Sequence, residues 1–170
     1  MGDLVPAGGT GTRWVRFAAP TVAAVVWFLL PRPHKRGLAV RAVLALALTA
    51  VLVSTAGLLH DDPRPFAVDP LSPALFRHAA DNGFPSDHTA YAAAVSQLVL
   101  TVRRRIGFVL CACSVIGGSA RVAATVHHWQ DIVAGLLVAV AAVALTALVC
   151  SFVDRRRSAA RDHGPAVPVA

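Results

Sequence analysis

Apolar residues are gathered along the chain into five stretches that short polar segments separate. Ile132–Val153 contains no charged residue, and roughly 20 apolar residues are enough for a helix to cross the hydrocarbon core of a bilayer. Because backbone polar groups in lipid must be hydrogen-bonded within their own segment, we expect each stretch to be a helix. The other four are Trp14–Leu30, Leu38–Leu59, Ser86–Val102 and Ile106 to about Val126. The pattern predicts an all-α, polytopic transmembrane helical bundle with about five spans.

The composition agrees with a membrane protein. Of 170 residues, 56% are hydrophobic and 15% are charged, whereas a soluble domain carries about 25% charged residues. This argues against a disordered chain, a coiled coil and a nucleic-acid-binding domain, although the net charge is +7. We expect one membrane-embedded domain over residues 1–170, with flexible tails at 1–13 and 155–170 and no cleaved signal peptide. Membrane lipids are expected partners, and nucleic acid is not.

Charged residues divide the polar segments into two groups. Pro31–Gly37 with Arg41, Arg103–Arg105 and the tail from Asp154 together hold eleven Lys or Arg against two Asp. The remaining segments hold five basic residues and seven Asp. Basic loops stay in the cytoplasm. The sequence therefore predicts a cytoplasmic C-terminus and, with five spans, an external N-terminus.

Unusual polar residues collect in three short clusters, at the helix ends opposite to the basic loops. The clusters are His60–Phe66, Phe84–Thr89, and Ala120-Arg121 together with His127–Asp131. Alternating helices of a bundle bring these clusters to one end, and ionisable groups at the margin of a membrane domain are functional candidates. We therefore expect a single site on the outer, extracytoplasmic face.

Arg64, Arg121 and Ser86 predict an anion site. Each guanidinium group offers a planar fork of donors suited to phosphate or carboxylate oxygens. Ser86 lies at a predicted helix start, where backbone N–H groups and the positive end of the helix dipole attract anions. Asp87 is open to two interpretations: a charge that favours the helix N-terminus, or a member of the site.

His88, His127 and Asp131 predict the catalytic groups. Two histidines from different helices can serve as a nucleophile and a general acid. Asp131 follows His127 by four residues, so on a continuous helix the two share a face, and the carboxylate can hold the imidazole in one tautomer. An anion site with a nucleophile, an acid and an orienting carboxylate favours phosphoryl transfer.

A metal-binding or transporting bundle is the alternative class of function. Against it, no charged relay crosses the middle of the spans, because the polar groups gather at one end. The segment Asp61-Asp62-Pro63 is interpreted more simply as a turn that stops a helix. The residues that could in principle hold a divalent metal are His60, His88, His127, His128 and Asp131.

Three blocks of the chain resemble the type 2 phosphatidic acid phosphatase superfamily of membrane lipid phosphatases, which is related to the vanadium haloperoxidases. That pattern has a Lys followed seven places later by Arg-Pro, then Pro-Ser-Gly-His, then Ser-Arg, five residues, His, three residues and Asp. The resemblance covers roughly Leu38 to Val153 and implies the helical core of that family. The matching residues here are Arg64-Pro65, Pro85-Ser86-Asp87-His88, and Ala120-Arg121 with His127 and Asp131 at the same spacing.

A finer resemblance is to the undecaprenyl-diphosphatase branch, which is associated with bacitracin resistance. It rests on Arg64–Phe66, His78–Asp81 and Phe84–Thr89, including Asp87 where the wider family has Gly. It implies an enzyme of a bacterial-type plasma membrane that converts undecaprenyl diphosphate to undecaprenyl phosphate and so recycles the lipid carrier of cell-wall synthesis. Phosphatidic acid, phosphatidylglycerol phosphate and other lipid phosphates stay open as substrates.

The resemblance and the local chemistry imply the same roles. His127 attacks the terminal phosphorus and forms a phosphohistidine, while Asp131 orients it. His88 protonates the departing oxygen and then activates water. Neither a cofactor nor a metal is expected. The expected substrate-binding residues are Arg64, Arg121, Ser86 and Asp87.

Two residues depart from the family pattern. Gly57 stands where the family has Lys, so one phosphate-binding cation is absent, and His60 or Arg77 are the candidates to replace it. Ala120 stands where the family has Ser, which removes one hydroxyl group.

Overall fold

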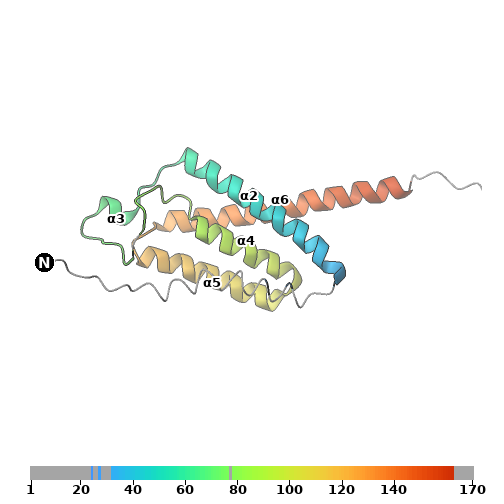
Figure 1. Ribbon diagram of the computed structural model, residues 1–170, viewed down its shortest axis with the longest axis horizontal. Helices are drawn as coiled ribbons and strands as arrows, with labels where there is room; N and C mark the ends of the chain where they lie inside the picture. Colours follow the sequence, from blue (N-terminus) through green and yellow to red (C-terminus); the bar gives the residue numbers. More distant parts are fainter. Residues whose placement is uncertain (1–23, 25–26, 28–31, 77, 163–170) are drawn as a thin grey trace, which may run out of the picture.

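The computed structural model describes Ala24, Trp27, residues 32–76 and residues 78–162. This part of the chain is helical and contains no strand, as the all-α prediction requires (Figure 1). The predicted span Trp14–Leu30 lies outside the described residues, except for Ala24 and Trp27. The helices are α2 (Arg32–Leu59), α3 (Pro65–Val68), α4 (Asp87–Val102), α5 (Arg104–Ala123) and α6 (Trp129–Asp162).

Three of these helices, α2, α5 and α6, are long and apolar enough to cross a membrane. Their exposed side chains include Val43, Phe108 and Leu137, each more than half accessible. Such surfaces fit lipid rather than water, so this is the architecture of a multi-pass membrane protein. Helix α4 is shorter, at 16 residues, and packs against α2, α5 and α6.

Small residues let α4 lie close to its neighbours. Ala90 and Ala94 of α4 are fully buried. A Cβ atom at Gly118 of α5 would come within 2.6 Å of Ile132, and one at Gly135 of α6 within 2.7 Å of the carbonyl oxygen of Ser86. Close backbone approach of this kind is typical of helices that associate in membranes. It fixes the first turn of α4 against the first turns of α6.

The two ends of the bundle differ in charge. The start of α2, the junction of α4 and α5 at Arg103, and the end of α6 all lie at one end (Figure 1). The basic residues that predict a cytoplasmic face belong to these three segments. The opposite end holds α3 and the connecting segments that carry the polar clusters.

Helix α6 is longer than the span predicted at Ile132–Val153. It begins at Trp129 and continues to Asp162, so residues 155–162, which were expected to belong to a flexible tail, are helical. The change to charged residues after Val153 does not end α6, because Arg and Ala favour helices. A helix outside lipid also needs no apolar surface. The Cζ atom of Arg156 lies 4.7 Å from the centroid of the Phe152 ring, a cation–π contact within this extension.

Candidate active site

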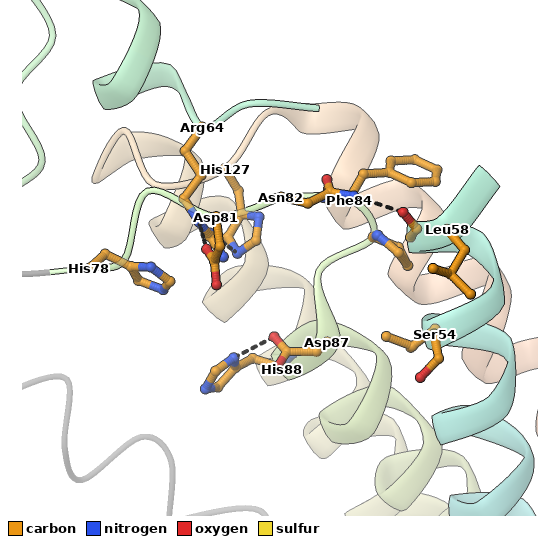
Figure 2. Close-up of a pocket in the computed structure, with 13 residues that line it drawn as sticks. Ser54, Leu58, Arg64, His78, Asp81, Asn82, Phe84, Asp87, His88 and His127 are labelled. Carbon is orange, nitrogen blue, oxygen red and sulfur yellow. Dashed lines mark hydrogen bonds and ion pairs between the residues drawn. The ribbon is translucent and has the colours of Figure 1, made fainter. Parts of the chain in front are cut away.

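The three polar clusters meet at one cavity at the end of the bundle that holds α3 (Figure 2). Arg64 is the residue before α3, His88 lies in the first turn of α4, and His127 precedes α6. The cavity has a volume of about 510 Å³. The described residues that line it are Val53, Ser54, Gly57, Leu58, Arg64, His78, Asp81, Asn82, Phe84, Pro85, Asp87, His88 and His127.

His127 is held in one tautomer by two partners. Its Nδ1 lies 3.1 Å from Oδ2 of Asp131, and its Nε2 lies 3.1 Å from Nη1 of Arg64. A carboxylate only accepts hydrogen bonds and a guanidinium group only donates them. Nδ1 therefore carries the proton and Nε2 presents its lone pair toward Arg64. This is the form that a nucleophilic imidazole requires.

Asp131 and His127 are paired across the start of α6 rather than along one continuous helix. Because α6 begins at Trp129, His127 lies in the connection before it. Asp131 accepts a second hydrogen bond at Oδ2, from the backbone N–H of His128 at 2.9 Å. The side chains of His127 and Asp131 are 1% and 0% exposed. The carboxylate thus fixes both the ring and the backbone beside it, and neither of the two side chains is exposed to solvent.

Arg64 joins the first cluster to the third. It is buried, and its Nη1 donates to the carbonyl oxygen of Val126 at 2.8 Å. Its Nε donates to Oδ1 of the exposed Asp81 at 2.7 Å. Burial acts to raise the pKa of Asp81, but the hydrogen bond and charge of Arg64 outweigh it and hold that pKa below its ordinary value.

His88 has its own carboxylate partner. Oδ1 of Asp87 accepts from the backbone N–H of His88 at 2.6 Å and lies 2.6 Å from its Nδ1. Nη2 of Arg121 approaches the same Nδ1 at 3.4 Å. The shorter contact places the Nδ1 proton between His88 and Asp87. Asp87 is the first residue of α4 and also lines the cavity, and a role for it in substrate binding stays a prediction.

Ser86 and Arg121 are not among the described residues that line the cavity. Ser86 is fully buried, with its hydroxyl oxygen 3.0 Å from Oγ1 of Thr89. Its backbone N–H donates to the carbonyl oxygen of Asp131 at 3.0 Å and so connects α4 to α6. A substrate-binding role for Ser86 and Arg121 stays a prediction.

Asn82, which the sequence patterns did not single out, ties the segment before α4 to the end of α2. Its Nδ2 donates to the carbonyl oxygens of Gly57 at 3.0 Å and His60 at 2.9 Å. Its Oδ1 accepts from the backbone N–H groups of Asp62 at 3.0 Å and Phe84 at 2.9 Å. The turn-forming sequence Asp-Asn-Gly at 81–83 is the signal that marks it.

Asp62 is more than the turn residue that its Asp-Asp-Pro context indicates. Its Oδ2 accepts from Nε2 of Gln130 at 2.5 Å and lies 3.0 Å from Nδ1 of His128. Among the described residues, donor atoms of Asp62, His128 and Asp131 lie within 4.8 Å of one another, a spacing that a metal ion can use. His60, His88 and His127, which the metal interpretation also needs, do not belong to this group.

The connection between α5 and α6 turns sharply before His127. Thr125 has a φ of 59°, in the left-handed region that β-branched residues rarely adopt. Its hydroxyl group donates to the carbonyl oxygen of Pro73 at 2.9 Å, and its own carbonyl oxygen accepts from the backbone N–H of Phe66 at 3.2 Å. These contacts hold the strained turn, after which Val126 and His127 are buried.

Two curated proteins are similar to this chain. A Bacillus licheniformis protein named bacitracin transport permease protein BcrC is 31% identical over 116 residues, which are 68% of this chain and 57% of the relative. Undecaprenyl-diphosphatase BcrC of Bacillus subtilis (strain 168) is 37% identical over 83 residues, which are 49% of this chain and 42% of the relative. The chain thus spans about half the length of the curated relatives it matches.

A solved structure and a family model cover more of the chain. The crystal structure of Aquifex aeolicus LpxE superposes with a TM-score of 0.67 at 21% identity, over 84% of this chain and 87% of that one, which shows a shared fold. A family model described as the PAP2 superfamily matches residues 38–156, close to the range that the motifs mark and with all three blocks inside it. The chain therefore belongs to the PAP2 superfamily.

Proposed function

We propose that the protein is a membrane phosphatase that removes the terminal phosphate of a polyprenyl diphosphate, with undecaprenyl diphosphate as the preferred substrate. The observation that carries this proposal is the state of His127: Asp131 holds its Nδ1 proton, and Nε2 presents a lone pair beside Arg64 in a cavity shared with His88. The name of the Bacillus subtilis relative supports this choice of substrate. The product would be the lipid carrier phosphate that peptidoglycan synthesis reuses.

In the first step, Nε2 of His127 attacks the terminal phosphorus. A nitrogen–phosphorus bond forms while the bond to the bridging oxygen breaks. His88 donates a proton to that oxygen, and polyprenyl monophosphate leaves. The proton on Nδ1 of His127 stays in its hydrogen bond to Asp131, which stabilises the positive ring.

In the second step, water releases the phosphate. His88, now neutral, takes a proton from the water as it attacks the phosphohistidine. The nitrogen–phosphorus bond breaks, inorganic phosphate leaves, and His127 and His88 return to their starting states. In both steps Arg64 neutralises charge on the non-bridging oxygens, where most of the catalysis of phosphoryl transfer resides. Arg121, Ser86 and Asp87 complete the proposed substrate-binding set.

The walls of the cavity support an amphiphilic substrate. Leu58 and Phe84 provide apolar surface on one side, while Arg64 and His127 lie on another (Figure 2). Leu58 at the end of α2 is 88% exposed, so this side continues into surface that suits lipid. A diphosphate headgroup can enter the polar part while its polyprenyl tail stays in the membrane.

We place the site on the extracytoplasmic face and the C-terminus in the cytoplasm. The separation of basic segments and polar clusters to opposite ends of the bundle supports this orientation, because basic segments stay inside. Accessibility of a cysteine introduced at position 162 to an impermeant thiol reagent, in intact cells and in lysed cells, tests the orientation.

The test of the activity is phosphate release from undecaprenyl diphosphate by the purified protein. His127→Ala should lower the rate by about 10³-fold or more with the fold intact, because the nucleophile is gone. His60→Ala is the matched control, since His60 is exposed and is not among the described lining residues. Vanadate, which adopts the geometry of the transition state, should inhibit competitively. A His127→Ala protein with a near-normal rate would remove the proposed nucleophile.

Two rival functions have distinct outcomes. Phosphatidic acid or phosphatidylglycerol phosphate would be the substrate if its kcat/KM exceeded that of undecaprenyl diphosphate in the same assay. The second rival, a transporter, is favoured by the name of the Bacillus licheniformis relative. Transport needs two compartments and hydrolysis does not, so turnover of a lipid phosphate in detergent solution favours the phosphatase.

A further inference from the structure

The cavity is short of permanent positive charge for a diphosphate ligand. Among the described residues that line it, Arg64 is the one Lys or Arg, and it lies with two carboxylates, Asp81 and Asp87. Arg64 also donates to Asp81, so part of its charge is already neutralised. A phosphate group that enters needs a further cationic donor, because a buried anion is stable only when it is paired.

Each of the three lining histidines is a cationic donor only when its ring is protonated. Two of them already have roles in the proposed reaction. His127 must keep its lone pair at Nε2 to attack phosphorus. His88 must give its proton to the leaving oxygen. His78 has no role in either step, and its ring extends from the segment before α4 toward Asp81 and His127 (Figure 2).

His78 lies close to the proposed nucleophile. The centroids of its ring and the His127 ring are 6.3 Å apart, with the planes at 77°. A phosphorus atom ready for attack lies about 3–3.5 Å from the nucleophile. A charge-assisted hydrogen bond to a phosphate oxygen is about 2.7–2.9 Å long. At these lengths, one phosphate group at His127 can be reached by both rings.

The ring of His78 is arranged to gain a proton at Nε2. Its Nδ1 lies 3.2 Å from the carbonyl oxygen of Ala79, which can only accept, so Nδ1 carries a proton and Nε2 is the nitrogen that titrates. Burial lowers the pKa of His78 most, the hydrogen bond to Ala79 acts against it, and the charges of Arg64 and Arg121 lower the pKa further, so that it stays below its ordinary value. The ring is therefore neutral at neutral pH without ligand. The negative charge of an entering phosphate group would oppose the charges of Arg64 and Arg121 and so raise the pKa of His78.

The other candidates for the missing charge are less suited. Arg121 is not among the described lining residues, and its Nη2 approaches Nδ1 of His88 at 3.4 Å. A Cβ atom at Gly57 would lie 3.1 Å from the carbonyl oxygen of Phe84, so α2 packs too closely there for a longer side chain to enter without displacing the loop. His60 packs edge-on against Phe84, with 4.6 Å between ring centroids, and is not among the described lining residues. Arg77 lies outside the described residues.

We propose that His78 is a substrate-binding residue that takes up one proton from solvent when a phosphate group binds and donates from Nε2 to a non-bridging oxygen of the group held at His127. This assignment rests on the proposed phosphatase site. It gives the branch sequence His78–Asp81 a function: Asp81 holds Arg64, and His78 supplies the second, ligand-dependent cation.

The test is calorimetric binding of inorganic phosphate to the full-length purified protein, in two buffers of different ionisation enthalpy at neutral pH. The difference in binding enthalpy between the two buffers gives the number of protons taken up on binding. Protons that phosphate itself gains or loses are the same for every variant, so they drop out when variants are compared. His78→Gln should take up fewer protons than wild type and bind about 10- to 100-fold more weakly, because a charge-assisted hydrogen bond is lost. His78→Lys, which is always charged, should recover affinity without the extra proton.

His60→Gln is the matched control and should behave as wild type in both affinity and proton uptake. A His78→Gln protein with wild-type affinity and wild-type proton uptake would overturn the assignment, as would a wild type that binds no phosphate. Rescue by His78→Lys excludes misfolding as the cause of weak binding, and a His78→Lys protein that folds but fails to bind overturns the assignment as well. Proton-linked binding without release of phosphate from any lipid substrate would reject the proposed function alone.

Discussion

Nε2 of His127 lies 3.1 Å from Nη1 of Arg64, so the nitrogen proposed to attack phosphorus already faces a positive charge. The same Nη1 donates to the carbonyl oxygen of Val126, which fixes the guanidinium group relative to the backbone that carries the nucleophile. The hydrogen bond from Nη1 occupies the lone pair of Nε2, so Arg64 must transfer this bond to a phosphate oxygen before Nε2 can attack phosphorus. The bonds of Arg64 to Val126 and Asp81 keep its charge beside the site during that exchange, and a positive charge held in place in advance lowers the cost of stabilising the transition state.

Asp131→Asn should lower kcat far more than it lowers stability. The amide nitrogen can donate to Nδ1 of His127, which would move the ring proton to Nε2 and abolish the lone pair. A loss on the order of 10²–10⁴ in kcat is expected, as for other catalytic histidines deprived of their carboxylate. Steady-state phosphate release together with thermal unfolding in detergent measures both quantities. A variant with a wild-type kcat would show that Asp131 does not set the tautomer.

His88→Asn should affect the two chemical steps differently. With p-nitrophenyl phosphate the leaving group needs no proton, so formation of the phosphohistidine should survive, while its hydrolysis loses the base. We expect a burst of about one equivalent of p-nitrophenol followed by slow turnover. Stopped-flow absorbance checks the burst, and acid-labile, base-stable phosphate on the protein checks the intermediate. Equal slowing of burst and steady state would contradict the role of His88.

Asp81→Asn should make the melting temperature fall less steeply as the pH is lowered into the acid range. Arg64 holds the pKa of Asp81 below its ordinary value although burial acts to raise it. A carboxyl group with a lower pKa in the folded than in the unfolded chain stabilises the fold above its unfolded pKa of about 3.9. That stabilising contribution is lost as the pH falls through the pKa that Asp81 has in the folded protein. Tm measured against pH should fall less steeply below pH 4, roughly, in the variant.

Asn82→Asp should destabilise the site end of the bundle. The change keeps the acceptor but replaces the amide donor with an oxygen that faces the carbonyl oxygens of Gly57 and His60. Two hydrogen bonds are lost and repulsion is added, for about 2–3 kcal/mol. Asn82→Ala removes all four hydrogen bonds of this side chain without adding repulsion. Thermal unfolding of the two variants beside wild type measures both effects, and an Asn82→Asp protein as stable as wild type would show that the amide donor does not hold this end of the bundle.

Removal of metal should leave turnover intact. Asp131 is engaged by His127 and His128, and Asp62 by His128 and Gln130, so the group of possible metal ligands already forms a hydrogen-bonded frame. No proposed step uses a metal. Phosphate release in excess EDTA should equal that in buffer alone. A loss restored by one added divalent cation would favour the metal-dependent alternative.

The sequence was sufficient to predict the class of fold and the convergence of the three clusters. Long apolar stretches permit few structures in lipid, and antiparallel neighbours must bring alternate connections to one end. Spacing also predicted the pairing of His127 with Asp131. It predicted a shared helix face, however, whereas the structure forms the pair across a helix start that the turn at Thr125 sets up.

Asp62, His78 and Asn82 were not predicted because they act through contacts distant in sequence. Asn82 bonds residues 22 and 25 positions away, and Asp62 meets residues 66 and 68 positions away. They belong to irregular segments, where no periodicity indicates which side chain faces which neighbour. The start of α2 and both ends of α6 were missed for a different reason. Hydropathy marks where lipid ends, but the backbone hydrogen bonds of a helix continue beyond it.

The length of α6 also bears on where its charged end lies relative to the membrane. A helix of 34 residues is about 51 Å long, some 20 Å more than the hydrocarbon thickness that it has to cross. The apolar part of α6 ends at Val153, so the arginines from Arg155 to Arg161 extend beyond the span on the same unbroken helix. The direction in which these charges project is therefore the direction of the span itself, which packing within the bundle determines.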